Sequence, residues 1–223
     1  MKALGTNIKA VFFDHDDTLV GTIVPKWAHH KHVARTHYDK ELLDEEIRSH
    51  WGKPLPELVK VLYGTENTEE ALANNALSHE QFPKILFNGS IELLMSLHKK
   101  GIKTGIITAT SRFNFEHDID LHKFPRASID YTQTADDTPY HKPDARVFEP
   151  AIAWLRERTI EPNEVVYVAD GLHDMNAAIG VGFQFVGVET GLVKGSDFLA
   201  KGVKSFPTIM DINRVVSLPD SSS

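Results

Sequence analysis

The stretch that decides the fold is IKAVFFDHDDTLV, residues 8–20. Four apolar residues, 10–13, lead directly into Asp14, and Asp16 follows two positions later. An apolar run without a polar interruption predicts a strand that is buried on both faces of a sheet. Two carboxylates at the tip of such a strand repel each other unless a cation or a shared proton offsets the charge. We therefore interpret the tip as a chemical site in which one carboxylate attacks, the other handles a proton, and a divalent metal ion sits between them.

The bulk composition narrows the classes of protein. The chain has 223 residues, of which 41% are hydrophobic, enough for one substantial core with or without a small accessory lobe. The net charge of -7 argues against binding nucleic acid or an anionic membrane through bulk charge. The absence of cysteine excludes disulfides and thiolate chemistry. Because we find neither a run of about 20 apolar residues nor a signal-peptide pattern, we expect a soluble, cytoplasmic protein.

Strand-like and helix-like patterns alternate along most of the chain. Apolar, β-branched runs recur at 102–107, 165–168 and 185–188, with a weaker one at 128–131. Between them, apolar residues repeat at helical spacing, for example at Ile91, Leu94 and Met95. This alternation predicts an α/β fold with a Rossmann-like, doubly wound parallel sheet. The carboxyl ends of its strands then share one edge, where ligands bind in such sheets.

Residues 21–87 break the alternation. Their patterns are helical, as in the apolar stripe between 55 and 62 and the Asn67 to Glu70 pair typical of a helix start. A crossover between parallel strands needs only about a dozen residues, so we interpret this stretch as an insertion. The expected domains are a Rossmann-like core, 1–20 with 88–223, and a helical cap, 21–87. Because both junctions adjoin the tip of the first strand, the cap is expected to act as a lid.

Four histidines, His29, His30, His32 and His37, fall within the expected cap. A zinc site is one interpretation, but no cysteine or carboxylate stands in a zinc-binding pattern around them. We expect a solvated helix surface.

Side chains suited to phosphate chemistry follow the other strands. Thr108 and Ala109 come after the second strand, where a hydroxyl and free amides at a helix start suit a phosphate. A role of Thr108 or Thr110 as a helix N-cap is an equally good explanation. Lys142 stands in a loop before Pro143, and a surface lysine is the alternative there. Asp170 ends the fourth strand, and Asp174, four residues on, could be an ordinary carboxylate at a helix start. Together these groups suit metal-assisted phosphoryl transfer.

In this order the four motifs resemble those of the haloacid dehalogenase-like (HAD) hydrolases. The resemblance covers about residues 8–206 and rests on Asp14 to Thr18, Thr108, Lys142, and Asp170 with Asp174. The position of the insertion is similar to that of the family's helical C1 caps. Phosphoglycolate phosphatases and β-phosphoglucomutases look like the nearest relatives.

The resemblance implies a role for each catalytic group. Asp14 would be the nucleophile that forms an aspartyl-phosphate, and Asp16 would be the general acid and base. Thr108 and the Ala109 amide would hold phosphate oxygens. Lys142 would supply positive charge to the nucleophile and the phosphate.

The resemblance also implies Mg²⁺ as the cofactor. Its ligands would be the carboxylates of Asp14 and Asp170 and the backbone carbonyl of Asp16. Asp174 would bind through water or orient the other ligands. His15 stands where many relatives have an apolar residue, and we expect this difference to matter little because only its backbone would adjoin the metal.

The function expected is a Mg²⁺-dependent phosphatase for a small phosphorylated metabolite, in a monomer or homodimer. The family's dehalogenases and phosphonate hydrolases lack the second carboxylate, so Asp16 argues against both activities. A phosphomutase of the β-phosphoglucomutase type and a non-catalytic phospho-ligand-binding protein remain as alternatives. In the cap, Lys53 would contact the anionic end of the substrate, or it is an exposed lysine in a turn between helices.

Overall fold

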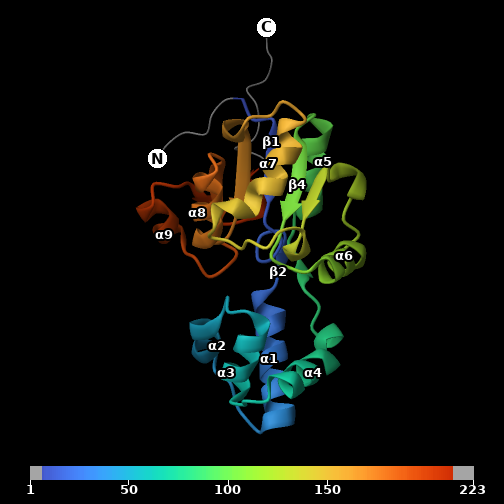
Figure 1. Ribbon diagram of the computed structural model, residues 1–223, viewed down its shortest axis with the longest axis vertical. Helices are drawn as coiled ribbons and strands as arrows, with labels where there is room; N and C mark the ends of the chain where they lie inside the picture. Colours follow the sequence, from blue (N-terminus) through green and yellow to red (C-terminus); the bar gives the residue numbers. More distant parts are fainter. Residues whose placement is uncertain (1–6, 213–223) are drawn as a thin grey trace. The chain divides into compact units, whose positions relative to one another are not determined.

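The computed structural model describes residues 7–212. They form two compact units, a larger one of residues 7–21 and 86–212 and a smaller one, Thr22–Ile85 (Figure 1). This smaller unit lies within the insertion expected from the sequence, 21–87, and lacks only residue 21 and residues 86–87 of it.

The larger unit is built on a six-stranded sheet. Its strand order is β5-β4-β1-β6-β7-β8, and every neighbouring pair is parallel. The strands are β1 (Ala10–Phe13), β4 (Lys103–Ile107), β5 (Tyr131–Gln133), β6 (Val165–Ala169), β7 (Gln184–Val188) and β8 (Ser205–Phe206). The chain runs from β1 outward to β5, then crosses to β6 and runs outward to β8. The predicted Rossmann-like α/β fold is therefore confirmed.

Alternate residues of each strand face opposite cores. Val11 and Phe13 of β1 pack in one core, beside α5 (Ser90–Lys99), α6 (Arg112–Leu121) and η6 (Ile209–Ile212). Ala10 and Phe12 pack in the other, beside α7 (Glu149–Arg156), α8 (Leu172–Gly180) and α9 (Gly195–Ala200). Both faces of β1 are covered, which explains its uninterrupted apolar sequence. Short 3-10 helices complete the unit: η2 (Arg126–Ser128), η3 (Ala135–Asp137), η4 (Ala145–Phe148) and η5 (Pro162–Glu164).

Some local expectations were wrong. The strand predicted at 128–131 begins only at Tyr131, because η2 extends to Ser128 and residues 129–130 belong to neither element. Met95 is exposed, and α5 buries Leu93 and Leu97 together with Leu94. A second sheet, β2 (Val20–Gly21) with β3 (Ile85–Leu86), consists of strands too short to give a sequence pattern.

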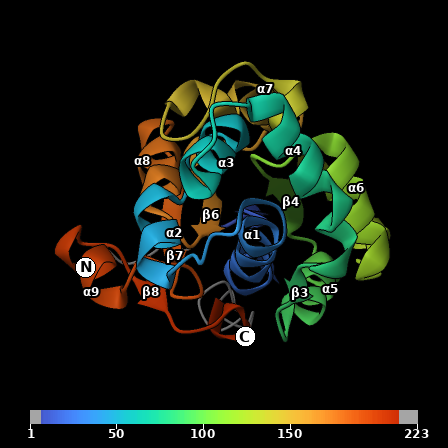
Figure 2. The same ribbon diagram turned by 90° about the horizontal axis from the view of Figure 1, so that it is seen from below.

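The smaller unit is helical, as expected. It contains α1 (Ile23–Tyr38), α2 (Asp44–His50), α3 (Leu55–Tyr63), α4 (Thr68–Leu77) and the 3-10 helix η1 (His79–Gln81). Helices α3 and α4 both pack on α1, and α2 packs on α3 (Figure 2). Asn67 accepts the backbone amide of Glu70, which confirms the predicted helix start. No helix within residues 7–212 has the length and apolarity needed to cross a membrane.

The expectation of a solvated histidine surface was wrong for two of the four residues. His29 and His30 are only 1% and 4% exposed. His29 Nε2 lies 3.1 Å from the Ser78 hydroxyl, and His30 Nδ1 lies 2.9 Å from the Tyr63 hydroxyl. Their polar atoms are satisfied inside the unit, which is what allows a polar residue to be buried.

Candidate active site

The parallel strands bring the expected site residues to one edge of the sheet. β1 lies between β4 and β6, with Phe13 opposite both Ile106 and Val168. Asp14, which follows β1, donates its amide to the Val168 carbonyl at 2.9 Å. Thr108 and Asp170 directly follow β4 and β6, so they end up at the same edge.

Lys142 joins two of the expected carboxylates. Its Nζ lies 2.6 Å from an oxygen of Asp14 and 2.6 Å from an oxygen of Asp174. It also donates to the Ile107 carbonyl at 3.2 Å and lies 5.3 Å from the ring centre of Tyr167. Because the Lys142 side chain is only 10% exposed, the alternative of a surface lysine is excluded.

The site carries more buried negative charge than Lys142 can balance. Burial raises the pKa of Asp14, Lys142 opposes the rise, and Asp174 and Asp16 add to it, so that the pKa reaches about 7. Burial and the charges of Asp14 and Asp174 raise the pKa of Asp170 well above its ordinary value. For Lys142, burial lowers the pKa, but the same two carboxylates outweigh it and raise the pKa well above its ordinary value. Such a cluster suits a bound cation.

Asp16 is held by two threonine hydroxyls. Thr110 Oγ1 donates to Asp16 Oδ2 at 2.6 Å, and Thr108 Oγ1 donates to the same oxygen at 3.4 Å. The sequence pattern offers Thr110 only as a helix cap, but the N-cap of α6 is Ser111. The signal that could have found Thr110 is its position in the chain. Thr110 follows the end of β4 by the same number of residues as Asp16 follows the end of β1.

The turn after β1 is fixed by its own backbone and by β6. The His15 carbonyl accepts the amides of Leu19 at 2.9 Å and of Val20 at 3.1 Å. Asp17 takes a left-handed conformation with φ of 53°. The Asp170 amide donates to the Thr18 hydroxyl at 3.2 Å, which ties the turn to the tip of β6.

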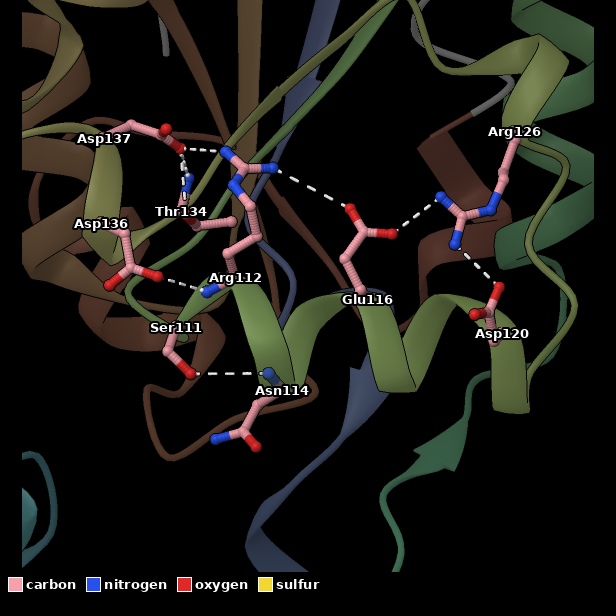
Figure 3. Close-up of polar contacts among 9 residues, drawn as sticks. All are labelled: Ser111, Arg112, Asn114, Glu116, Asp120, Arg126, Thr134, Asp136 and Asp137. Carbon is pink, nitrogen blue, oxygen red and sulfur yellow. Dashed lines mark hydrogen bonds and ion pairs between the residues drawn. The ribbon is translucent and has the colours of Figure 1, made fainter.

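The segment after β5 holds the start of α6 (Figure 3). Asp136 accepts the Arg112 amide at 2.7 Å, and Asp137 pairs with the Arg112 guanidinium. Asp137 also accepts the Thr134 amide at 2.7 Å. The Ala135 amide donates to the Thr110 carbonyl at 3.0 Å, so this segment fixes the loop that carries the Asp16 partners.

The donor set suits Mg²⁺, which takes oxygen ligands and usually keeps several waters, with one or two carboxylates. Asp14 and Asp170 offer two carboxylates whose pKa values are raised first by burial and then by the charges of neighbouring carboxylates. Within residues 7–212, no group of three or more His, Asp or Glu side chains encloses a metal position. A site completed by backbone oxygen and water is consistent with that result.

Of the remaining expected contacts, one lies at the site and one does not. Ala109 follows Thr108 at the end of β4 and is exposed in the loop before α6. Lys53 belongs to the smaller unit, between α2 and α3, and forms an ion pair with Glu57 one helical turn later.

Comparison with known proteins identifies the family of the chain. Residues 11–188 match the family described as haloacid dehalogenase-like hydrolase. The chain belongs to this family. It is 31% identical over 187 residues to a Clostridium perfringens protein named "Putative pyrophosphatase PpaX", covering 82% of this chain and 84% of the relative.

Two further relatives extend the comparison. Pyrophosphatase PpaX of Anoxybacillus flavithermus is 26% identical, with 87% of this chain and 89% of the relative covered. A crystal structure described as "putative beta-phosphoglucomutase from Thermotoga maritima" has the same fold, with a TM-score of 0.78, 22% identity, and coverage of 94% and 98%. As a HAD-family member the chain is an enzyme, a hydrolase of the phosphatase type.

Proposed function

We propose that this phosphatase hydrolyses a small phosphorylated metabolite through an aspartyl-phosphate on Asp14, with Mg²⁺ as cofactor. The observation that carries the proposal is the placement of Asp14 against Lys142 with Asp16 two residues away. A nucleophile needs a neighbouring positive charge to stay ionised and a separate group to handle the proton.

The reaction divides into two transfers. In the first, an Asp14 oxygen bonds to phosphorus while the bond to the leaving oxygen breaks, and Asp16 gives its proton to that oxygen. In the second, Asp16 takes a proton from water as the water oxygen attacks phosphorus, which breaks the bond to Asp14 and releases phosphate. Asp14 and Asp16 end as they began, and Thr110 keeps Asp16 oriented through its 2.6 Å bond.

Charge balance supports the cofactor. Asp14 and Asp170, with the backbone carbonyl of Asp16, would hold Mg²⁺, and Asp174 would contribute through water or by orienting the others. When bound, the ion supplies positive charge that favours ionised carboxylates and stabilises charge on phosphate oxygens. Lys142 supplies the fixed part of this charge, and Thr108 with the Ala109 amide would hold the remaining phosphate oxygens.

Pyrophosphate is the first substrate to test. Relatives named pyrophosphatase are 26–31% identical to this chain over most of its length. Substrate choice is assigned to the smaller unit, where Lys53 would contact the anionic end of the substrate. A Lys53→Ala variant should raise KM for the true substrate, and an unchanged KM would exclude the contact.

The deciding experiment is phosphate release by the purified chain. The panel would hold pyrophosphate, phosphoglycolate, sugar phosphates and nucleotides, each with Mg²⁺ and with EDTA. Asp14→Asn should abolish turnover while the protein stays folded, and appreciable activity in that variant would refute the nucleophile assignment. Conversion of a sugar phosphate into its isomer without phosphate release would favour the phosphomutase alternative instead. A complete lack of turnover would leave only ligand binding.

A further inference from the structure

His15 makes a buried polar contact that the resemblance does not explain. Its side chain is fully buried, and Nε2 lies 3.1 Å from Asp118 Oδ2. The ring packs edge-on against Phe115, with centres 5.3 Å apart, and also touches Phe124 at 6.0 Å. An apolar residue at position 15 could fill this space, but it would make no directional bond to Asp118.

Asp118 belongs to the helix that begins directly after the loop whose threonine hydroxyls donate to Asp16. This helix, α6, starts at Arg112, and Asp118 is 5% exposed on its buried side. Thr110, in the preceding loop, donates to Asp16 at 2.6 Å. Two consecutive residues after β1 are therefore bonded to one loop-helix segment, His15 to the helix and Asp16 to the loop.

These two bonds constrain each other. The His15 carbonyl is already fixed by the amides of Leu19 and Val20, so the backbone between His15 and Asp16 has little freedom. A bond from the His15 ring to α6 then limits how the turn can move against the loop that orients Asp16. Displacements of about 1 Å caused by residues away from the chemistry can lower rates about 100-fold.

We propose that His15 is a positioning residue, whose bond to Asp118 aims the Asp16 carboxylate at the leaving oxygen of the substrate. The inference rests on the proposed function, in which Asp16 protonates that oxygen. His15 itself touches neither substrate nor cofactor in this role.

The test is the dependence of the rate on the leaving group. A series of aryl phosphates, from strongly to weakly acidic phenols, varies how much the reaction needs an acid while substrate size changes little. The ratio kcat/KM is the correct quantity, because it reports steps up to transfer of the phosphoryl group to Asp14. General acid catalysis contributes about 10²–10⁴-fold, mostly for poor leaving groups.

We expect His15→Leu to lower kcat/KM by about tenfold or more for weakly acidic phenols and only a few-fold for strongly acidic ones. His15→Gln, which keeps a donor at a similar reach, should recover part of the loss. Asp118→Asn should give the same selective loss of kcat/KM as His15→Leu, but a smaller one, because it removes the carboxylate charge and keeps the shape of the side chain. A loss of folded protein lowers the apparent kcat/KM for all substrates by the same factor, so it cannot produce this pattern.

Arg126, the first residue of η2, provides a matched control. Its exposed side chain pairs with two residues of α6, Glu116 at 2.8 Å and Asp120 at 2.7 Å (Figure 3). Arg126→Gln should leave the leaving-group dependence of the parent enzyme unchanged.

The failures are distinguishable. If Asp16→Asn steepens the leaving-group dependence and neither His15→Leu nor Asp118→Asn does, His15 does not position Asp16 and the inference is wrong. Should His15→Leu fail to fold, Asp118→Asn decides by the same criterion. If the parent enzyme hydrolyses no phosphate, or Asp14→Asn stays active, the proposed function itself fails.

Discussion

The two buried histidines of α1 should make the smaller unit sensitive to acid. His29 and His30 are held neutral, each with a pKa of about 4 against an ordinary 6.5. For His29 the causes are burial, then the charges of Lys26 and His79. For His30 they are burial, then His29 and Lys26. His32 also faces His29 and lowers its pKa further.

The sign follows from proton binding. The unfolded chain takes up a proton on each histidine as the pH falls below 6.5, whereas the folded unit does so only near 4. Their contribution to stability is therefore complete above pH 6.5 and declines between the two values. When the pH is lowered from about 7.5 to about 5, protonation of each histidine in the unfolded chain should lower the free energy of unfolding by about 2 kcal/mol. The two losses are not independent, because protonated His29 would oppose protonation of His30.

Urea unfolding followed by tryptophan fluorescence can measure this loss in one unit. Two of the three tryptophans, Trp27 and Trp51, lie in the smaller unit and pack 5.9 Å apart. A Trp154→Phe background removes the third, so that the signal comes from the smaller unit. The measurement is the free energy of unfolding at a series of pH values between 5 and about 7.5.

The variants separate these histidines from other titrating groups. His29→Gln keeps a polar group near Ser78, and His30→Asn keeps one near Tyr63, but neither replacement titrates. Each should reduce the acid-induced loss by about 2 kcal/mol, while His37→Gln, at an exposed position, should not change it. An acid-induced loss of the same size in the His29, His30 double variant and the parent would refute the reasoning.

Other predictions concern the larger unit. Lys142→Met should abolish activity and lower the free energy of unfolding by about 3–5 kcal/mol, measured by urea unfolding, because buried carboxylates lose their cation. Thr110→Val should lower kcat by about tenfold with KM nearly unchanged in steady-state assays, because Asp16 loses its shorter bond. EDTA should abolish phosphate release, and added Mg²⁺ should restore it. Gly105→Ala should cost about 1–3 kcal/mol in thermal unfolding, since its methyl group would lie 2.7 Å from the Phe12 ring.

The sequence predicts the sheet well where strands are covered on both faces. The run at 10–13 is β1 to the residue, because both cores demand apolar side chains there. At the sheet's edge the signal weakens, and β5 was placed too early. Strands of two residues, such as β2, are too short for any periodicity to register.

The candidate site was foreseeable because topology, and not local sequence, brings it together. Thr108 and Asp170 are far from Asp14 along the chain, yet each follows a strand that is parallel to β1 and paired with it, so the topology predicts that they meet. Lys142 stands in a loop, and its place beside Asp14 was expected only from the family resemblance. What the sequence could not give is the partner of each polar side chain. Polar residues on a helix suggest exposure, so buried histidines such as His29 are concealed until the packing is known.

Position 15 shows why such partners matter for mechanism. From the sequence, His15 is a departure from an apolar pattern and of little consequence, since its backbone alone adjoins the expected metal. In the fold, the ring is enclosed and bonded to Asp118, and the adjacent residue is Asp16. A buried carboxylate and a buried imidazole are costly to keep without a partner, so the pair constrains the turn more tightly than apolar packing could. Because general acid catalysis depends on orientation, the residue between the two carboxylates can tune the rate without touching the substrate.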